Sequence, residues 1–511
     1  MQKASEQVAQ RLGLDAPPGE TTARSQHAER LPPAPAPSPR ELNPDLCVIG
    51  GGSGGLSVAA AAAQLGVSVV LIEKHKMGGD CLNYGCVPSK ALLTASGRAH
   101  AMRTAAPFGI APVRPAIDHA AVNDHVRAVI AAIAPNDSVE RFTGLNVKVI
   151  NAPARFIDRK RVLAGEWRVK ARRFVIATGS SPAIPSIAGL AEVPYFTNET
   201  IFANRDKLEH LIVIGAGPIG LELAQAHLRL GSRVTVLEGF KALSKDDPEM
   251  SQLVLERLKT EGMDIREGVL IERIAGANGA IDVAIAEAGV NRVVRGTHLL
   301  LATGRSANVT GLDLEAARVK YDQGGIKVNG ALKTSNRRVY AIGDVTGGPQ
   351  FTHVANYHAD IVVRRALFRL PAKVNGDIVP WTTFTDPELA HVGLSEEAAR
   401  RRFGRIRVLR WPFHENDRAQ TERATDGFIK VITDAKGRIL GASVVGRLAG
   451  EVIQMWCLAV AQGLKINAMT RWISPYPALC EVNKRVAYGY YASAAASPFV
   501  RKLIGWLARL G

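Results

Sequence analysis

The sequence predicts an α/β protein that contains two Rossmann-like units. A buried strand, a glycine-rich turn, an alanine-rich helix and a second strand follow one another at 45–74, and the same order returns at 211–238. Strands that alternate with helices in this way indicate a parallel sheet covered by helices. The two repeats therefore place the chain in the α/β class.

The composition is that of a globular protein with several domains. The chain has 511 residues, of which 47% are apolar and 22% charged, so it can bury a large core. Five cysteines are too few for a disulfide-stapled secreted scaffold. No apolar run reaches the ~18–20 residues that cross a bilayer, and the N-terminus lacks a basic head followed by an apolar core. We therefore expect a cytoplasmic protein with reduced thiols.

The formal net charge is +17, which is compatible with nucleic acid, anionic lipid or an anionic small molecule as a partner. Lys and Arg are scattered along the chain, with modest clusters at Arg400–Arg402 and Arg168–Arg173. Basic stripes with interleaved aromatic residues do not occur. We expect no nucleic-acid partner and interpret the charges as a solvated surface.

Residues 1–43 differ in composition from the rest. The segment LPPAPAPSPR at 31–40 carries five prolines, which favour an extended spacer over packed structure. We predict a disordered Pro-rich extension, with order beginning at Pro44. It contains no cysteine pair, so it cannot be a thiol-based metal-binding module.

The first glycine-rich turn predicts a dinucleotide site. Gly50, Gly52 and Gly55 fit GxGxxG directly after a strand, and Glu73 lies 23 residues beyond Gly50 at the end of the next strand. The glycines permit a tight turn, a close approach of the backbone to a pyrophosphate and close helix–strand packing. The helix N-terminus would face the phosphates, and Glu73 would accept hydrogen bonds from a ribose diol.

The second turn repeats this arrangement with Gly215, Gly217 and Gly220. Two units imply two dinucleotides, or a duplication in which one copy is inactive. Glu238 again lies 23 residues past the first glycine and would repel a 2′-phosphate, so it favours NADH over NADPH. Arg233 and Lys241 lie close in sequence and weaken that preference.

The block GGDCLNYGCVPSKAL at 78–92 holds two nearby thiols, Cys81 and Cys86. Such a pair could bind metal, stay inert or form a disulfide. The remaining cysteines, which are Cys47, Cys457 and Cys480, show no zinc-ligand spacing, so we predict no structural metal. Five residues of regular helix rise ~7.5 Å, whereas a disulfide needs Cα atoms under ~7 Å apart. A disulfide between Cys81 and Cys86 would therefore require Gly85 and Pro88 to distort the turn. Because a strained disulfide is readily reduced, we predict a redox-active pair.

Two glycine-rich units around a CxNxGCVPSK block resemble the flavin-dependent pyridine nucleotide-disulfide oxidoreductases (class I), which include dihydrolipoamide dehydrogenase, glutathione reductase and mercuric reductase. The resemblance spans about residues 44–490 and includes ATGSSP (177–182), ATGRSAN (302–308), AIGDV (341–345) and WTTFTDPELAHVGLSE (381–396). It implies a homodimer with an α+β dimerisation domain after the two Rossmann-like domains. The implied parts are an FAD domain at 44–190 and 308–375, an NAD(P) domain at 191–307, a dimerisation domain at 376–496 and a basic C-terminal helix at 497–511.

The resemblance also assigns roles to residues. FAD would be held by Gly50, Gly52, Gly55, Glu73, Lys90, Thr178, Gly179 and Asp344, and NAD(P)H by Gly215, Gly217, Gly220, Glu238 and Gly304. Electrons would pass from NAD(P)H through the flavin to Cys86, while Cys81 would be the outer thiolate that meets the substrate, favoured by a helix N-terminus. Lys90 and Glu222 would form an ion pair beside the flavin ring.

The chain departs from its disulfide-reducing relatives in the segment SPYPALCE at 474–481. Those relatives carry a His-Pro there, with a Glu five residues after the His that orients it as a proton shuttle. Here Glu481 is retained, but the His position is Tyr476, whose pKa of ~10 is far from the ~7 wanted of a base. We therefore predict poor turnover of lipoamide or glutathione. Tyr476 resembles the tyrosine of mercuric reductases, which implies a soft metal ion as substrate.

The likeness to mercuric reductases is incomplete, because this chain ends in GWLARLG where those enzymes carry a Cys-Cys pair. Cys480 could supply a third thiol from the partner subunit, although we expect a buried structural residue. We expect His353 and His414 to be structural. Pro218, Asp80 and Tyr84 are unusual for the family, and we assign no role to them.

Three functions remain open at this point. The first is a reductase of a soft metal ion or a thiol-bound electrophile. The second is a dihydrolipoamide dehydrogenase-type enzyme that works on a specialised carrier. The third is a membrane-surface flavoprotein that passes electrons to a quinone or a protein.

Residues 497–511, SPFVRKLIGWLARLG, predict a basic amphipathic helix. Its apolar face comprises Phe499, Val500, Leu503, Ile504, Leu507 and Leu510, flanked by Arg501, Lys502 and Arg509. The helix could dock on its own dimer or lie on an anionic membrane. The second alternative predicts a cytoplasmic enzyme that is peripheral at the membrane.

Overall fold

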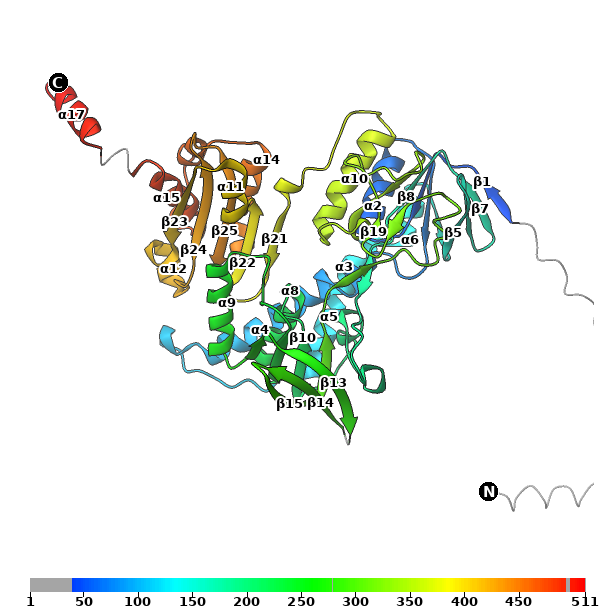
Figure 1. Cartoon of the computed structure of the whole chain (residues 1–511), viewed down its shortest axis with the longest axis horizontal. Coiled ribbons are helices and arrows are strands. Elements are labelled where there is room, and N and C mark those ends of the chain that lie inside the picture. The colour runs from blue at the N-terminus through cyan, green and yellow to red at the C-terminus, as the bar shows by residue number, and fades with distance from the viewer. Residues whose placement is uncertain (1–38, 278, 493–496, 511) are drawn as a thin grey trace, which may run out of the picture. The chain divides into compact units, whose positions relative to one another are not determined.

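The computed structural model describes residues 39–277, 279–492 and 497–510 (Figure 1). Most of the predicted Pro-rich extension lies outside the described residues. The prediction that order begins at Pro44 is wrong by a few residues, because Arg40–Leu42 form strand β1, which pairs in parallel with β7 (Trp167–Lys170). The amide of Arg40 donates to the carbonyl of Glu166 at 2.8 Å, and the Leu42 side chain packs on the core.

The first Rossmann-like unit is a five-stranded parallel sheet in the order β20-β8-β2-β3-β4. Its strands are β2 (Leu46–Ile49), β3 (Val69–Glu73), β4 (Val147–Asn151), β8 (Arg173–Ile176) and β20 (Val339–Ala341). The last strand comes from much later in the chain, so two separate segments build one sheet, as the resemblance implies. The helices α2 (Ser53–Gln64) and α10 (Thr352–Ala366) pack against each other on one face.

The two faces of this sheet are filled by alternating side chains of the same strands. Leu46 and Val48 point to the core beneath α2 and α10, whereas Cys47 and Ile49 point to the opposite core. The second face is covered by a small sheet in the order β1-β7-β6-β5, with β5 at Ala154–Asp158 and β6 at Arg161–Ala164. Burial on both sides explains why these strands read as continuous apolar runs.

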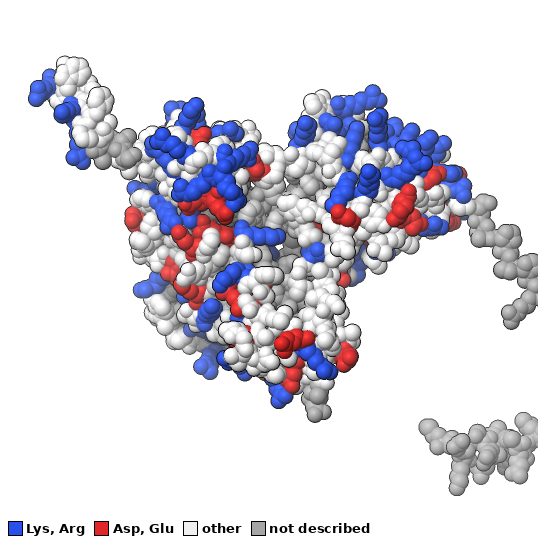
Figure 2. All heavy atoms as spheres, in the orientation of Figure 1, with Lys and Arg blue, Asp and Glu red and all other residues white. Residues whose placement is uncertain are grey.

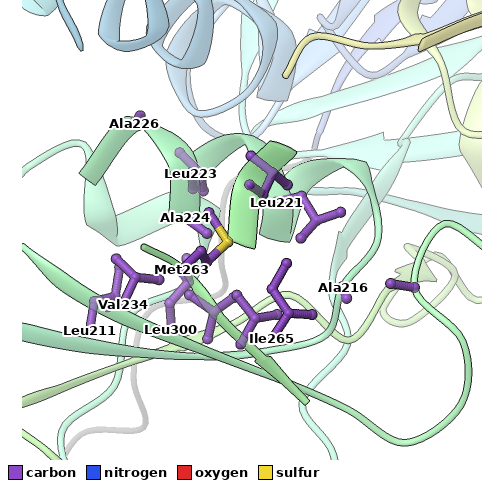
Figure 3. Close-up of a cluster of buried hydrophobic side chains, with 14 of the residues drawn as sticks. Leu211, Ala216, Leu221, Leu223, Ala224, Ala226, Val234, Met263, Ile265 and Leu300 are labelled. Carbon is purple, nitrogen blue, oxygen red and sulfur yellow. The ribbon is translucent and has the colours of Figure 1, made fainter. Parts of the chain in front are cut away.

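The second Rossmann-like unit is a four-stranded parallel sheet in the order β12-β11-β10-β16. Its strands are β10 (His210–Ile214), β11 (Arg233–Glu238), β12 (Asp264–Glu267) and β16 (His298–Leu301). Helix α8 (Pro218–Arg229) presses leucine and alanine side chains onto one face of the sheet, where they meet Met263 and Ile265 (Figure 3). Helix α9 (Pro248–Thr260) adds to the same core, and the antiparallel strands β13 (Leu270–Ala277), β14 (Ala280–Glu287) and β15 (Val290–Gly296) cover the other face.

The C-terminal region is α+β, as predicted. Its five-stranded antiparallel sheet has the order β21-β22-β25-β24-β23. The strands are β21 (Pro380–Thr383), β22 (Glu388–Gly393), β23 (Ile406–Pro412), β24 (Phe428–Asp434) and β25 (Ile439–Gly446), and the helices are α11 (Glu396–Phe403), α12 (Asp417–Glu422), α13 (Ala449–Val452), α14 (Gln454–Ala461) and α15 (Val482–Gly489). Trp456 is fully buried in this core and donates to Asn483 at 2.7 Å.

Three helices follow the first βαβ turn and lead toward the second unit. They are α3 (Gly79–Asn83), α4 (Cys86–Arg103) and α5 (His119–Ile133), and α4 packs on both α8 and α5. Short elements complete this region: α6 (Val139–Gly144), α7 (Asn198–Ile201), and the strand pairs β9 (Ser180–Pro182) with β17 (Arg305–Ala307) and β18 (Tyr321–Asp322) with β19 (Gly325–Ile326). The residue bounds assigned to the domains stay predictions.

The predicted C-terminal helix is present as α17 (Pro498–Leu507), with Ser497 at its N-cap position and proline in its first turn. Its large apolar side chains are exposed, among them Phe499, Leu503, Ile504, Trp506 and Leu507. In the part of the chain that the structure describes, no helix is both long and apolar enough to cross a bilayer.

Candidate active site

A single cavity of about 2470 Å³ brings most of the predicted site residues together. The predicted residues that line it are Gly50, Gly52, Glu73, Cys81, Cys86, Lys90, Thr178, Gly179, Gly215, Gly217, Glu222, Glu238, Gly304 and Asp344. Gly55 and Gly220 lie behind the two turns and do not line it. Tyr476 and Glu481 are also not among its lining residues.

The first glycine-rich turn has the geometry that a pyrophosphate needs. Gly50 has φ +111°, and a Cβ at Gly55 would lie 1.9 Å from the Gly50 carbonyl oxygen, so both positions require glycine. The carboxylate of Glu73 accepts the amide of Gly51 at 2.5 Å and that of His75 at 2.8 Å. These bonds hold Glu73 at the carboxyl edge of the sheet, where a ribose would lie.

The second turn is a close copy of the first. A Cβ at Gly220 would lie 2.0 Å from the Gly215 carbonyl oxygen, and a Cβ at Gly217 would point into open space at the N-terminus of α8. Glu238 accepts the amides of Ala216 at 2.8 Å and Phe240 at 2.9 Å. Open backbone at a helix N-terminus together with a fixed ribose-binding acid fits a dinucleotide at each turn.

The cysteine pair spans a break between two helices. Cys81 lies in α3, whereas Cys86 is the first residue of α4. Gly85 has a non-helical backbone conformation and separates the two helices. The expectation that Pro88 helps to distort the turn is wrong, because Pro88 lies within the first turn of α4, where a proline amide is not needed. Both cysteines are free thiols in this structure.

The two thiols differ strongly in acidity. Their mutual hydrogen bond raises the pKa of Cys81 far above its ordinary value and lowers the pKa of Cys86 to about 6. The Thr352 hydroxyl, 3.4 Å from Cys86 Sγ, and the charge of Lys90 also lower the pKa of Cys86. Cys81 lies in the first turn of the short helix α3, as expected, but its hydrogen bond with Cys86 and its burial raise its pKa, so the expected Cys81 thiolate is not favoured in this dithiol. Cys86 begins the longer helix α4.

Lys90 and Glu222 form the predicted ion pair, with 2.7 Å between Nζ and Oε2. The Lys90 ammonium also lies 4.4 Å from the centroid of the Phe384 ring. The second oxygen of Glu222 accepts the Phe384 amide at 2.9 Å. The pair thus connects α4, α8 and the end of β21 beside the cavity.

A polar network that the sequence did not reveal connects the cysteine loop to Asp344. Asp80 Oδ1 lies 3.2 Å from the Arg305 guanidinium and accepts the Asn198 amide at 3.0 Å. Arg305 donates to Ser180 Oγ at 2.7 Å, and Ser180 donates to Asp344 at 2.6 Å. Burial raises the pKa of Asp344. The one sequence signal for this network was the ATGRSAN motif, which contains Arg305.

The residues of the divergent segment lie apart from the thiols of the same chain. Tyr476 is 70% exposed and donates to Asp417 at 2.7 Å, a bond that raises the pKa of the phenol. Glu481 forms an ion pair with Arg485 at 2.9 Å. Cys480 is half-buried, with Sγ 3.8 Å from Ser474 Oγ.

The two histidines lie in exposed positions. The His353 ring nitrogen is 2.7 Å from the Pro380 carbonyl oxygen, and its ring stacks on Phe351. The carbonyl of His414 accepts the Gln420 side-chain amide. His353 also lines the cavity, so the structural interpretation given to both histidines stays a prediction.

Comparison with known proteins gives two family matches and several relatives. The model of pyridine nucleotide-disulphide oxidoreductases matches residues 44–359, and that of their dimerisation domain matches 379–487. A mercuric reductase of Lysinibacillus sphaericus is 35% identical over 450 residues, which are 88% of this chain and 82% of that protein. A dihydrolipoyl dehydrogenase of Thermus scotoductus is 34% identical over 447 residues, 86% of this chain and 95% of that protein.

Solved structures agree with these matches. The Cu(II) complex of the HOCl-induced flavoprotein disulfide reductase RclA from Escherichia coli superposes with a TM-score of 0.77 at 26% identity, covering 86% of this chain and 99% of that one. The dimerisation domain supports the predicted homodimer. With its two glycine-rich turns, thiol pair and Lys90–Glu222 ion pair around one cavity, the chain belongs to the pyridine nucleotide-disulphide oxidoreductases, enzymes that use FAD and NAD(P)H.

Proposed function

We propose that this enzyme passes electrons from NAD(P)H through FAD to the Cys81–Cys86 pair and on to a soft metal ion or a thiol-bound electrophile. The observation that carries the substrate assignment is Tyr476. At the position where the disulfide-reducing relatives carry a histidine, this chain has a tyrosine. The hydrogen bond to Asp417 raises the pKa of its phenol further. A group that holds its proton so firmly is a poor shuttle for a dithiol product.

A soft metal ion needs no such shuttle. Thiolates are the ligands that soft ions prefer, and Cys86 is held ready as a thiolate by its low pKa. The relatives include a mercuric reductase, and one similar structure was solved as a Cu(II) complex. The mercuric reductase favours a thiophilic ion such as Hg²⁺ as the substrate. The Cu(II) complex is that of a disulfide reductase and supports metal binding alone.

The chemistry that FAD would supply at this site is two-electron transfer between NAD(P)H and the sulfurs of Cys81 and Cys86, or a metal ion bound to them. The residues of this chain that would hold FAD are Gly50, Gly52, Gly55, Glu73, Thr178, Gly179 and Asp344, and those for NAD(P)H are Gly215, Gly217, Gly220, Glu238 and Gly304. Lys90, fixed by Glu222, would place a positive charge beside the ring. Thr352 would donate its hydroxyl to the Cys86 thiolate.

The overall reaction balances without any further reactant. NAD(P)H gives up two electrons and becomes NAD(P)⁺ with release of one proton. A divalent ion held between the sulfurs of Cys81 and Cys86 takes both electrons and leaves as the neutral metal. The partner subunit's equivalents of Tyr476 and Glu481 would lie near the outer thiol, as the family resemblance implies.

NADH is the proposed reductant. Glu238 lies at the carboxyl end of β11 with both oxygens fixed by backbone amides, where its charge would repel a 2′-phosphate. Arg233 begins the same strand, so at ~3.3 Å per residue it lies about 17 Å away along β11 and cannot offset that charge. Lys241 lies 4.0 Å from Glu267, which draws its ammonium toward another carboxylate.

The test is a comparison of acceptors with the purified holoenzyme. NADH oxidation is measured with Hg²⁺ in excess thiol, lipoamide, glutathione disulfide and a soluble quinone. Rapid turnover with Hg²⁺ that is lost in Cys81→Ser and Cys86→Ser supports the proposal. Rapid lipoamide turnover would instead support a dihydrolipoamide dehydrogenase-type enzyme, and quinone turnover that survives both variants would support the electron-transfer flavoprotein.

We also propose a cytoplasmic enzyme whose segment 497–511 contacts an anionic membrane. The apolar face of α17 is exposed, with Phe499 73% and Trp506 58% accessible, and Arg501 and Lys502 lie beside it. Docking on the partner subunit is the alternative. If the segment contacts the membrane, removal of residues 497–511 should weaken binding to anionic liposomes. If it docks on the partner subunit, the removal should lower dimer stability.

A further inference from the structure

A cluster of cations lies at one end of the first parallel sheet, over the region of α10 (Figure 2). We call it the basic face, and define it by the cations at the amino ends of β8 and β20, in the last turn of α10 and in the loop that follows it: Arg173, Lys333, Arg337, Arg338, Arg364, Arg365, Arg369 and Lys373. They come from three parts of the sequence, which explains why the charges appeared scattered. The loop after α10 is fastened beside Lys333, because the Val374 amide donates to the Gly330 carbonyl at 2.8 Å. Burial and the charges of Arg365, Arg173 and Arg337 lower the pKa of Lys333, which confirms their proximity.

None of the eight cations forms an ion pair with a carboxylate of the described residues, whereas the nearby Arg172 pairs with Asp45 at 3.2 Å. Asp360 lies one helical turn before Arg364 on α10 and does not pair with it. The contrast with α11 is clear, because Arg400 pairs with Glu396, and its two neighbours are paired as well. Unpaired like charges held together create a local positive potential that favours an anionic partner.

The basic face is distinct from the active site. It lies at the amino ends of β8 and β20, where Arg173 begins β8 and Arg338 precedes β20. The active-site residues Thr178 and Asp344 follow the carboxyl ends of the same two strands. Parallel strands place these two sets at opposite edges of the sheet, so the cations do not serve the FAD phosphates.

Two large apolar side chains project from the same place. Phe368 is 54% exposed and Leu370 is 52% exposed, both in the loop that follows α10 and between Arg365 and Lys373. Exposed apolar residues set among cations are the pattern of a surface that enters the boundary between lipid headgroups and acyl chains. A polyanion such as nucleic acid would engage the cations but gains nothing from Leu370.

We infer that the basic face docks this enzyme on an anionic lipid bilayer, with the cations at the headgroups and Phe368 and Leu370 inserted between them. The inference rests neither on the identity of the electron acceptor nor on α17. Each exposed cation at an anionic surface contributes roughly a fivefold factor in partitioning, so removing three should weaken binding about one hundredfold.

The test measures co-sedimentation of the full-length holoenzyme with liposomes of phosphatidylglycerol and phosphatidylcholine, and with phosphatidylcholine alone. The test variant carries Arg337→Gln, Arg364→Gln and Arg369→Gln, three exposed residues of the basic face. The matched control carries Arg400→Gln, Arg401→Gln and Arg402→Gln, which removes the same net charge from paired positions on α11. A third variant, Phe368→Ser, keeps every charge.

The expected result is salt-sensitive binding to the anionic vesicles alone, weakened about one hundredfold in the test variant and less than about threefold in the control. Phe368→Ser should weaken vesicle binding while leaving binding to heparin or DNA unchanged. Equal weakening in the test and control variants would overturn the inference, because net charge would then suffice. The inference would also be overturned if the unaltered enzyme did not bind the anionic vesicles, if the test variant bound them as well as the unaltered enzyme, or if the enzyme bound DNA more tightly than vesicles.

Discussion

The ammonium of Lys90 lies 2.7 Å from the carboxylate of Glu222, and this ion pair joins the cysteine-bearing helix α4 to helix α8 of the second Rossmann-like unit. The Glu222 side chain is only 6% exposed, whereas Lys90 retains 38% exposure toward the cavity. The acid is therefore anchored, and the cation can face a bound flavin.

Lys90→Met should slow flavin reduction by NADH roughly 10–100-fold, because a fixed positive charge stabilises the reduced ring. The measurement is rapid-mixing absorbance of the flavin under anaerobic conditions. Lys90→Arg, which keeps the charge, should recover part of the rate. Equal rates in the unaltered enzyme and Lys90→Met, with FAD content unchanged, would contradict this role.

The acidity of Cys86 predicts a pH dependence. Since the pKa of Cys86 is lowered to about 6, the thiolate exists above that pH and is lost as the pH falls through it. The thiolate–flavin charge-transfer absorbance of the two-electron-reduced enzyme should therefore rise with pH, with a midpoint near 6. Thr352→Val should move the midpoint upward, because the hydroxyl lowers the pKa of Cys86. A midpoint near that of a free thiol in both proteins would show that the contacts do not act on Cys86.

Cys86→Ser should abolish the charge-transfer band and metal reduction while leaving flavin reduction by NADH intact. Cys457→Ser is the matched control, because this half-buried thiol of α14 packs on the C-terminal core and does not line the cavity. Persistence of the band in Cys86→Ser would remove the assignment of this cysteine beside the flavin.

Tyr476→His should raise lipoamide turnover by roughly one to two orders of magnitude. Positioned acid–base groups contribute about 10²–10⁴-fold, and an unoptimised site should recover part of this. Steady-state kinetics with lipoamide and Hg²⁺ give the two rates, and only the lipoamide rate should rise. If lipoamide turnover stays low in an intact dimer, access to the thiols rather than proton transfer excludes the disulfide.

Glu238→Ala should lower the preference for NADH over NADPH by at least about tenfold, because it removes the charge that would repel a 2′-phosphate. The ratio of kcat/KM for the two nucleotides measures this. Arg233→Ala, at the far end of β11, should leave the ratio unchanged. A marked change in Arg233→Ala would mean that this guanidinium reaches the nucleotide.

Local patterns in the sequence were sufficient to predict the two parallel sheets and the turns between their strands. The steric demands at Gly55 and Gly220 are local, because a Cβ there would meet the carbonyl oxygen of Gly50 or Gly215 in the same turn. Each turn is also followed by an acid at the next strand end. The pair Lys90 and Glu222 followed from the family resemblance and was confirmed by their distance.

Contacts between distant segments were beyond what the sequence could reveal. Asp80 meets Arg305 across more than two hundred residues, and Thr352 reaches Cys86 from the start of α10. The relative acidity of the two thiols depends on such contacts and on which cysteine begins a long helix, so the sequence alone could not predict it. The basic face was missed for the same reason, since its cations come together only in the folded sheet.

The most direct test of the central claim is an anaerobic titration of the holoenzyme with NADH, followed by addition of Hg²⁺ in excess thiol. We predict that one equivalent of NADH produces the thiolate–flavin charge-transfer band, and that further NADH is consumed in a one-to-one ratio with Hg²⁺ converted to volatile neutral mercury. Cys81→Ser and Cys86→Ser should each abolish that conversion. If the reduced enzyme leaves Hg²⁺ unreduced but is rapidly reoxidised by lipoamide or a quinone, the account of a thiol-based soft-metal reductase is wrong.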